Sequence, residues 1–161
     1  MWYTHFASYG GFFFRKSQSY MKAAFKELGI SYVDSIVLIN VCEEPGIIQE
    51  KIGENLALDN AAVARSLKTM EQDGFVTRVI DVNNQRTKKV SPTQKGIDTK
   101  ELVDVAMTHW NSKMLAGISE SEQDVIISSL RTLRNQTMNI DMDEVLRELI
   151  VQWHGAEKEI S

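Results

Sequence analysis

The residues from Asn60 to Gln72 have the spacing of a helix with two chemically different faces. At 100° per residue, one face is apolar and carries Val63, Leu67 and Met70. The opposite face gathers small, hydroxyl, amide and basic groups, at Ala61, Arg65, Lys68, Thr69 and Gln72. Such groups can approach a phosphate backbone and hydrogen-bond the edges of bases. We therefore interpret this face as a candidate contact for nucleic acid.

Charge is concentrated around the same residues. The whole chain has a net charge of −4. Residues 1–59 and 97–161 are acidic, with net charges of −2 and −6, whereas residues 60–96 carry +4. Seven basic side chains produce this basic island: Arg65, Lys68, Arg78, Arg86, Lys88, Lys89 and Lys95. Its local field favours an anionic partner, although a charge run by itself is more often a solvated surface.

Three helices and a β-hairpin must position these groups. Apolar periodicity and stop signals predict helices over residues 32–43, 47–55 and 60–72. Asp59 is the expected N-cap of the third helix, and Gly74 is its expected end. Beyond Gly74 the period changes to two, which predicts a hairpin over residues 75–91 that turns at Asn83 and Asn84.

Longer helices flank this central part. They are predicted over residues 5–28, 93–116, 119–138 and 141–153. The first helix carries an aromatic stripe at Phe6, Phe13 and Tyr20, which needs a partner surface. Capping boxes are expected where Ser119 precedes Glu122 and where Asp141 precedes Glu144. A helix over 93–116 would be about 36 Å long, which indicates that it supports a second chain.

Two linked segments carry a more specific pattern. One is the run from Leu58 to Arg78, LDNAAVARSLKTMEQDGFVTR, and the other runs from Asp81 to Gly96, DVNNQRTKKVSPTQKG. Together they resemble the recognition helix and wing of the MarR family of bacterial and archaeal transcription regulators. The chain departs from that pattern in its wing, where Gln85 leaves one arginine missing, and at Pro92, where a leucine is usual. The segment beyond Met138 has no counterpart in the minimal pattern.

The resemblance implies a fold that is mainly α with a small β-hairpin wing, a winged helix-turn-helix with N-terminal and C-terminal dimerisation helices. We expect one domain over residues 1–161. Its expected parts are a DNA-binding part at 31–96, dimerisation helices at 1–30 and 97–161, and an extra tail helix at 139–161.

The resemblance also implies a homodimer that reads a pseudo-palindromic operator in double-stranded DNA. The expected DNA contacts are Asn60, Ala61, Ala62, Arg65, Lys68, Thr69, Asn84, Arg86 and Lys88. Arg86 at the wing tip suits the narrow minor groove of an A-tract, and Asp81 is placed to orient it. We expect a transcriptional repressor; the alternative is a winged-helix module that binds a protein partner without DNA.

Some members of the family bind salicylate-like phenolic acids beside a tyrosine and an arginine. Tyr32 and Arg15 match these residues, with Phe12 and Phe13 as apolar walls of an effector site. The other interpretation also stands, in which Tyr32 packs an interface and Arg15 is solvated. Under the first interpretation, the expected effector is a small aromatic or phenolic molecule that releases the DNA.

Other chemistry finds no support in the sequence. Cys42 lies in an apolar stretch, where a thiol is usually inert packing. His5, His109 and His154 lie far apart and form no metal pair, so we expect neither metal nor cofactor. No nucleophile motif or glycine-rich phosphate loop is present, which argues against an enzyme. No apolar run reaches the roughly 18 residues of a membrane span, and we expect a cytoplasmic protein.

Overall fold

The structure is a computed structural model that describes residues 2–81 and 84–159, with side chains described for residues 5–81, 84 and 87–154. It divides into two compact units, residues 1–114 and residues 115–161. The first unit contains, in order, α1 (Trp2–Glu27), α2 (Tyr32–Glu43), β1 (Ile47–Ile48), α3 (Gln49–Leu56), α4 (Asn60–Gln72), β2 (Val76–Asp81), β3 (Asn84–Pro92) and α5 (Gln94–Met114). The second contains α6 (Glu120–Thr137) and α7 (Met142–Glu159).

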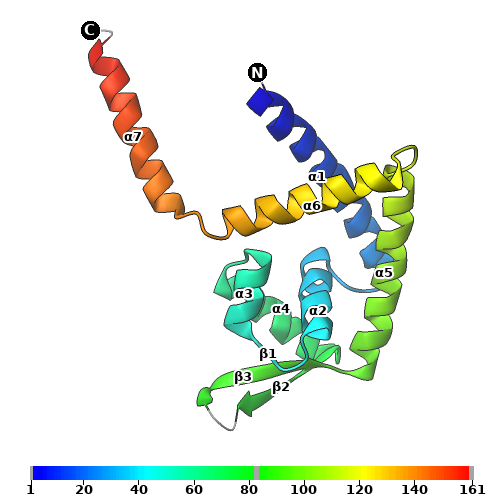
Figure 1. The fold of residues 1–161 in the computed structure, drawn as a ribbon. Coiled ribbons are helices and arrows are strands. Elements are labelled where there is room, and N and C mark those ends of the chain that lie inside the picture. Colours follow the sequence, from blue (N-terminus) through cyan, green and yellow to red (C-terminus); the bar gives the residue numbers. More distant parts are fainter. Residues whose placement is uncertain (1, 82–83, 160–161) are drawn as a thin grey trace. The chain divides into compact units, whose positions relative to one another are not determined.

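Helices α2, α3 and α4 and a three-stranded antiparallel sheet form a winged helix, which confirms the predicted fold class (Figure 1). The strand order is β1-β3-β2. Ile47 pairs with Val90, and Arg78 pairs with the same residue from the other side. The hairpin of β2 and β3 extends past the helices as the wing (Figure 1).

The core of this unit comes from the apolar positions that the periodicity singled out. Helix α4 buries Val63, Leu67 and Met70, as predicted. Helix α2 is apolar almost all round and buries Val37, Leu38 and Val41. Since both helices bury their apolar side chains in one cluster, the polar face of α4 is left outward.

Three of the four local signals predicted at the helix ends are confirmed. At the fourth, Asp141, the structure shows only one half of the predicted capping box, in which Oδ1 accepts from the N–H of Glu144 at 3.1 Å. Asp59 caps α4 through its Oδ1 atom, which accepts a hydrogen bond from the backbone N–H of Ala62 at 2.7 Å. Gly74 follows α4 with a φ of 76°, a left-handed conformation that glycine adopts without strain. Ser119 and Glu122 form a complete capping box at the start of α6.

Several predicted helix boundaries were wrong. Helix α1 begins at Trp2 rather than at residue 5. Ile47 and Ile48 form β1 rather than the first turn of a helix, because their backbone pairs with Val90 and Lys89 far along the chain. Helix α7 ends at Glu159 rather than Trp153. It passes through Gly155 because a single glycine costs a helix only about 1 kcal/mol.

The aromatic stripe of α1 is covered at one end only. The ring of Tyr20 stacks on Trp110 of α5, with centroids 4.9 Å apart, and the indole N–H of Trp110 donates to Ser17 Oγ at 2.9 Å. We expected Tyr20 to need a partner surface outside its own fold. That expectation is wrong for Tyr20, because α5 of the same chain covers its ring. Phe6 and Phe13 remain exposed.

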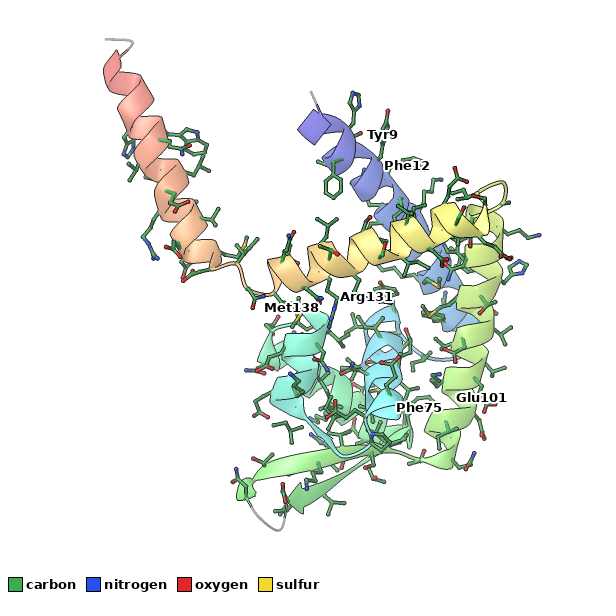
Figure 2. All side chains as sticks on the ribbon, viewed as in Figure 1. Tyr9, Phe12, Phe75, Glu101, Arg131 and Met138 are labelled. Atoms are coloured by element: carbon green, nitrogen blue, oxygen red, sulfur yellow. The ribbon has the colours of Figure 1, made fainter. Side chains whose placement is uncertain are left out.

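The junction between the wing and α5 explains why a glycine stands at position 96. A Cβ atom there would lie 2.2 Å from the backbone oxygen of Phe75, a distance that no side chain can occupy. Thr93 completes the junction, because its hydroxyl donates to Gly74 O at 2.6 Å and accepts from the N–H of Gly96 at 3.1 Å. Figure 2 shows Phe75 at this junction.

The second unit consists of α6 and α7, and no residue of α6 is buried within it. Its exposed apolar side chains include Ile127, Leu130 and Leu133 on α6. Those on α7 include Val145, Leu146, Leu149, Ile150 and Trp153, the predicted apolar face. Among all the helices described here, none combines the length and the hydropathy needed to cross a membrane.

Candidate nucleic-acid interface

The outer face of α4 lies open to solvent. Asn60, Ala61, Arg65, Lys68 and Thr69 are exposed, and Ala62 is half-buried beneath them. In the part of the chain that the structure describes, neither Arg65 nor Lys68 has an acidic partner within ion-pair distance. Their charges are therefore not neutralised within the chain and can meet phosphate or the acceptor atoms of a base.

An ion pair fixes the wing to this helix. The Nε atom of Arg78 on β2 donates to Glu71 Oε2 of α4 at 2.9 Å, and a second guanidinium nitrogen of Arg78 donates to the same oxygen. The hydrogen-bonded guanidinium lowers the pKa of the Glu71 carboxyl. Two bonds from a planar guanidinium that converge on one carboxylate oxygen restrict orientation as well as distance, so the base of the wing is oriented relative to α4.

Two lysines of the basic island make contacts within the folded chain. Lys89 on β3 forms an ion pair with Asp81, with Nζ and Oδ2 3.3 Å apart. The Nζ atom of Lys95 lies 4.2 Å from the centroid of the Phe75 ring and donates to Asp73 O at 2.7 Å. Sequence reasoning missed these roles because the partners lie across a strand pair or a turn.

In the described part of the chain, four cations of the island are exposed and have no ion pair: Arg65, Lys68, Lys88 and Lys95. Since Lys95 is held by Phe75 and Asp73, the cations left for a partner are Arg65, Lys68 and Lys88. Asn84 is exposed on the wing. The side chain of Arg86 lies outside the described residues, so the predicted orientation of Arg86 by Asp81 stays a prediction. The interface that the structure brings together is thus the outer face of α4 with Lys88 and Asn84 of the wing.

Known proteins that resemble this chain show which family it belongs to. The MarR family model matches residues 32–88, which span the winged helix. The chain is 32% identical over 133 residues to the uncharacterized HTH-type transcriptional regulator YybA of Bacillus subtilis, covering 83% of this chain and 87% of that protein. The chain belongs to the MarR family. Members of this family are winged-helix regulators of transcription that bind DNA, and this chain is one of them.

Solved structures of MarR-family regulators share the fold of this chain. A crystal structure of the transcriptional regulator SlyA has a TM-score of 0.74 and 34% sequence identity, covering 80% of this chain and 90% of that one. A MarR-family regulator from Listeria monocytogenes, solved in complex with a 26mer DNA, has a TM-score of 0.77 and 29% identity, covering 80% and 86%. The fold similarity thus includes a relative that was captured on DNA.

The predicted effector residues of this MarR-family chain fall into two groups. Tyr32 is half-buried, and its ring stacks on Phe25 with centroids 6.4 Å apart. It lines an open groove of about 560 Å³ at the start of α2, together with Lys22, Lys26, Gly29, Ile30, Ser31 and Val33. The cations of this groove are lysines of α1, which sequence reasoning did not single out although they lie one helical turn apart.

The remaining effector candidates lie nearer the N-terminus of α1. Phe12 and Phe13 are exposed, and Figure 2 shows Phe12 and Tyr9 projecting from α1 into solvent. The guanidinium of Arg15 is also exposed and lies over Gly11. Within this chain the structure therefore brings Tyr32 together with Lys22 and Lys26, and does not bring it together with Arg15.

The Cys42 thiol is half-buried in the described structure. Burial raises the pKa of the Cys42 thiol, which disfavours the nucleophilic thiolate at neutral pH. Within the described ranges, no three His, Cys, Asp or Glu side chains lie close enough to hold a metal ion.

Proposed function

We propose that this MarR-family chain is a sequence-specific repressor that binds double-stranded DNA as a homodimer and carries out no catalysis. The observation that carries the proposal is the outer face of α4, where Arg65 and Lys68 have no acidic partner in the described chain. A helix of this length fits a major groove, and a two-fold dimer presents two such helices to the half-sites of a pseudo-palindromic operator.

The relative from Listeria monocytogenes in complex with DNA supports duplex DNA as the ligand. In this proposal Asn60, Ala61, Ala62, Arg65 and Thr69 approach base edges. Lys68, Lys88 and Asn84 contact the backbone, and Arg86 enters the minor groove beside the wing.

Exposed apolar side chains support the homodimer. Phe6 and Phe13 on α1, and the apolar faces of α6 and α7, would be costly to leave in water on an isolated chain. Burying them against the same faces of a second copy removes them from water and satisfies the symmetry of the operator.

The groove at Tyr32 supports control by a small anionic, aromatic effector. Lys22 and Lys26 supply ammonium groups for a carboxylate, and the hydroxyls of Ser31 and Tyr32 supply further hydrogen bonds. Arg15, Phe12 and Phe13 do not line this groove within one chain, so we propose them as effector contacts that the second chain of the dimer contributes. Binding of the effector is proposed to release the operator.

The salt dependence of DNA binding tests the proposed function. Arg65, Lys68 and Lys88 give six exposed cations per dimer, so log K on random duplex DNA should fall against log salt concentration with a slope of about −5. Fluorescence anisotropy at several salt concentrations measures this slope. A slope near zero would favour the alternative, in which the same face of α4 binds a protein partner.

A further inference from the structure

One residue on the packed face of α4 differs in kind from its neighbours. Val63, Leu67 and Met70 are buried and apolar, whereas Ser66 among them is polar and only 5% exposed. Its Oγ–H donates to Oδ1 of Asp34 on α2 at 2.5 Å. This hydrogen bond joins α4 to α2 across 32 residues of sequence.

The acceptor of this bond is itself fixed in place. The second oxygen of the Asp34 carboxylate, Oδ2, accepts from Ser31 Oγ at 2.6 Å. The backbone N–H of Asp34 donates to the same hydroxyl at 3.1 Å, because Ser31 is the N-cap of α2. Both carboxylate oxygens are therefore engaged, and the side chain is tied to the first turn of α2.

This hydrogen bond restrains rotation of α4 about its own axis, a motion that apolar packing restrains only weakly. Apolar contacts are non-directional, so Val63, Leu67 and Met70 set how deep α4 lies more strongly than how it is rotated. A hydrogen bond to a fixed carboxylate is lost when its distance or angle changes appreciably. A rotation of about 10° about the helix axis would move side-chain atoms about 6 Å from that axis by about 1 Å. That displacement is enough to spoil a hydrogen bond to a base edge.

We propose that Asp34 and Ser66 are positioning residues that set the rotation of the recognition helix α4 and thereby its selectivity for the operator. This inference rests on the proposed DNA-binding function. Neither residue contacts DNA in the proposal: Ser66 is buried, and Asp34 acts through it. Their effect should therefore fall on base recognition, which needs accurate geometry, rather than on contacts with phosphates, which tolerate small displacements.

The experiment compares Ser66→Ala with the unmodified full-length protein on two DNA probes. One probe is the duplex that the unmodified protein selects from a random-sequence pool, and the other is an unselected duplex of equal length. Ser66→Ala should bind the selected duplex about ten-fold more weakly, since a hydrogen bond to a charged group is removed, and the unselected duplex within about two-fold. Equal affinity of both proteins for the selected duplex would overturn the inference.

Ser35→Ala is the matched control. Ser35 is also buried, but its hydroxyl donates to Tyr32 O within α2 at 2.8 Å and joins no second helix. It should leave the ratio of the two affinities unchanged. A ten-fold loss in Ser35→Ala as well would show that any buried hydroxyl has this effect, and would overturn the assignment to the contact between Asp34 and Ser66.

A second pair of variants separates positioning from simple destabilisation. Asp34→Asn keeps an oxygen that can accept from Ser66 and should restore most of the selectivity that Asp34→Ala loses, whatever their thermal stabilities. Amide hydrogen exchange without DNA reports on the contact directly, since α4 should exchange faster in Ser66→Ala but not in Ser35→Ala. If the unmodified protein bound no duplex, the proposed function would fail, while unchanged exchange in Ser66→Ala would overturn the positioning contact itself.

Discussion

Arg65 and Lys68 are neighbours on the outer face of α4, but we expect them to contribute differently to DNA binding. A guanidinium can donate two hydrogen bonds to one guanine, whereas an ammonium acts as a compact charge. Arg65 directly precedes Ser66, so its direction depends on the rotation of the helix. We therefore expect Arg65 to recognise a base and Lys68 to attract a phosphate.

Replacing Arg65 tests its role in base recognition. Arg65→Ala should lose about 1–3 kcal/mol on a selected duplex and blur the preference at one position per half-site. Lys68→Ala is the matched comparison, because it should weaken binding to selected and random duplexes alike and reduce the magnitude of the salt slope. Competition binding with both duplexes measures the two effects. Equal losses on both duplexes for Arg65→Ala would contradict its role as a base reader.

At the scale of elements, the ion pair between Arg78 and Glu71 links the wing to the recognition helix. The wing strand provides one partner and α4 provides the other, so the two DNA-contacting elements move together. The pair is partly exposed, and its contribution to stability is therefore below about 1 kcal/mol.

The pH dependence of this pair can be measured. The pKa of Glu71 is lower in the folded chain, so its stabilisation is present above the unfolded-state pKa of about 4.3 and is lost as the pH falls through the folded value. Glu71→Gln should lower the unfolding midpoint at pH 7, and the difference should vanish once the pH has fallen below the lowered pKa of Glu71. Glu50→Gln, which removes a glutamate without an ion pair in the described chain, should show no such change. A difference for Glu71→Gln that persists in acid would contradict this account.

The elements also show what could be predicted from the sequence and what could not. The bounds of α2 and α4 depend on local periodicity and on residues at the helix ends, Ser31, Asp59 and Gly74. Such local signals can be read from the sequence alone. Strand β1 was missed because only pairing with β3 makes it a strand. The bond between Asp34 and Ser66 was missed for the same reason, since neither residue has a sequence neighbour that signals it.

At the scale of the whole molecule, the association of two chains depends on exposed apolar surface. Each unit exposes apolar side chains, on α1 in the first unit and on α6 and α7 in the second. Two faces on different units can each bury against a second copy, which makes a dimer more stable than either face would alone.

We expect the full-length chain to be a dimer at micromolar concentration. Sedimentation should give about twice the chain mass of 18.3 kDa. Deleting residues 139–161 should weaken this dimer, because it removes Leu146, Leu149 and Trp153 from the surface. Circular dichroism of the shortened chain should show that the winged helix remains folded. A clean monomer of the full-length protein would contradict the homodimer and the operator geometry derived from it.

The stacked pair of Tyr20 and Trp110 gives the molecule a built-in optical reporter. The chain has three tryptophans, at positions 2, 110 and 153. The ring of Trp110 stacks on Tyr20 of α1, and its indole N–H donates to Ser17 Oγ. Indole emission responds to polarity and to nearby rings, so any sliding of α5 past α1 will change its wavelength and intensity. With Trp2 and Trp153 replaced by phenylalanine, one tryptophan remains. When it is excited at a wavelength that tyrosine does not absorb, its emission records the relative motion of these two helices without an added dye.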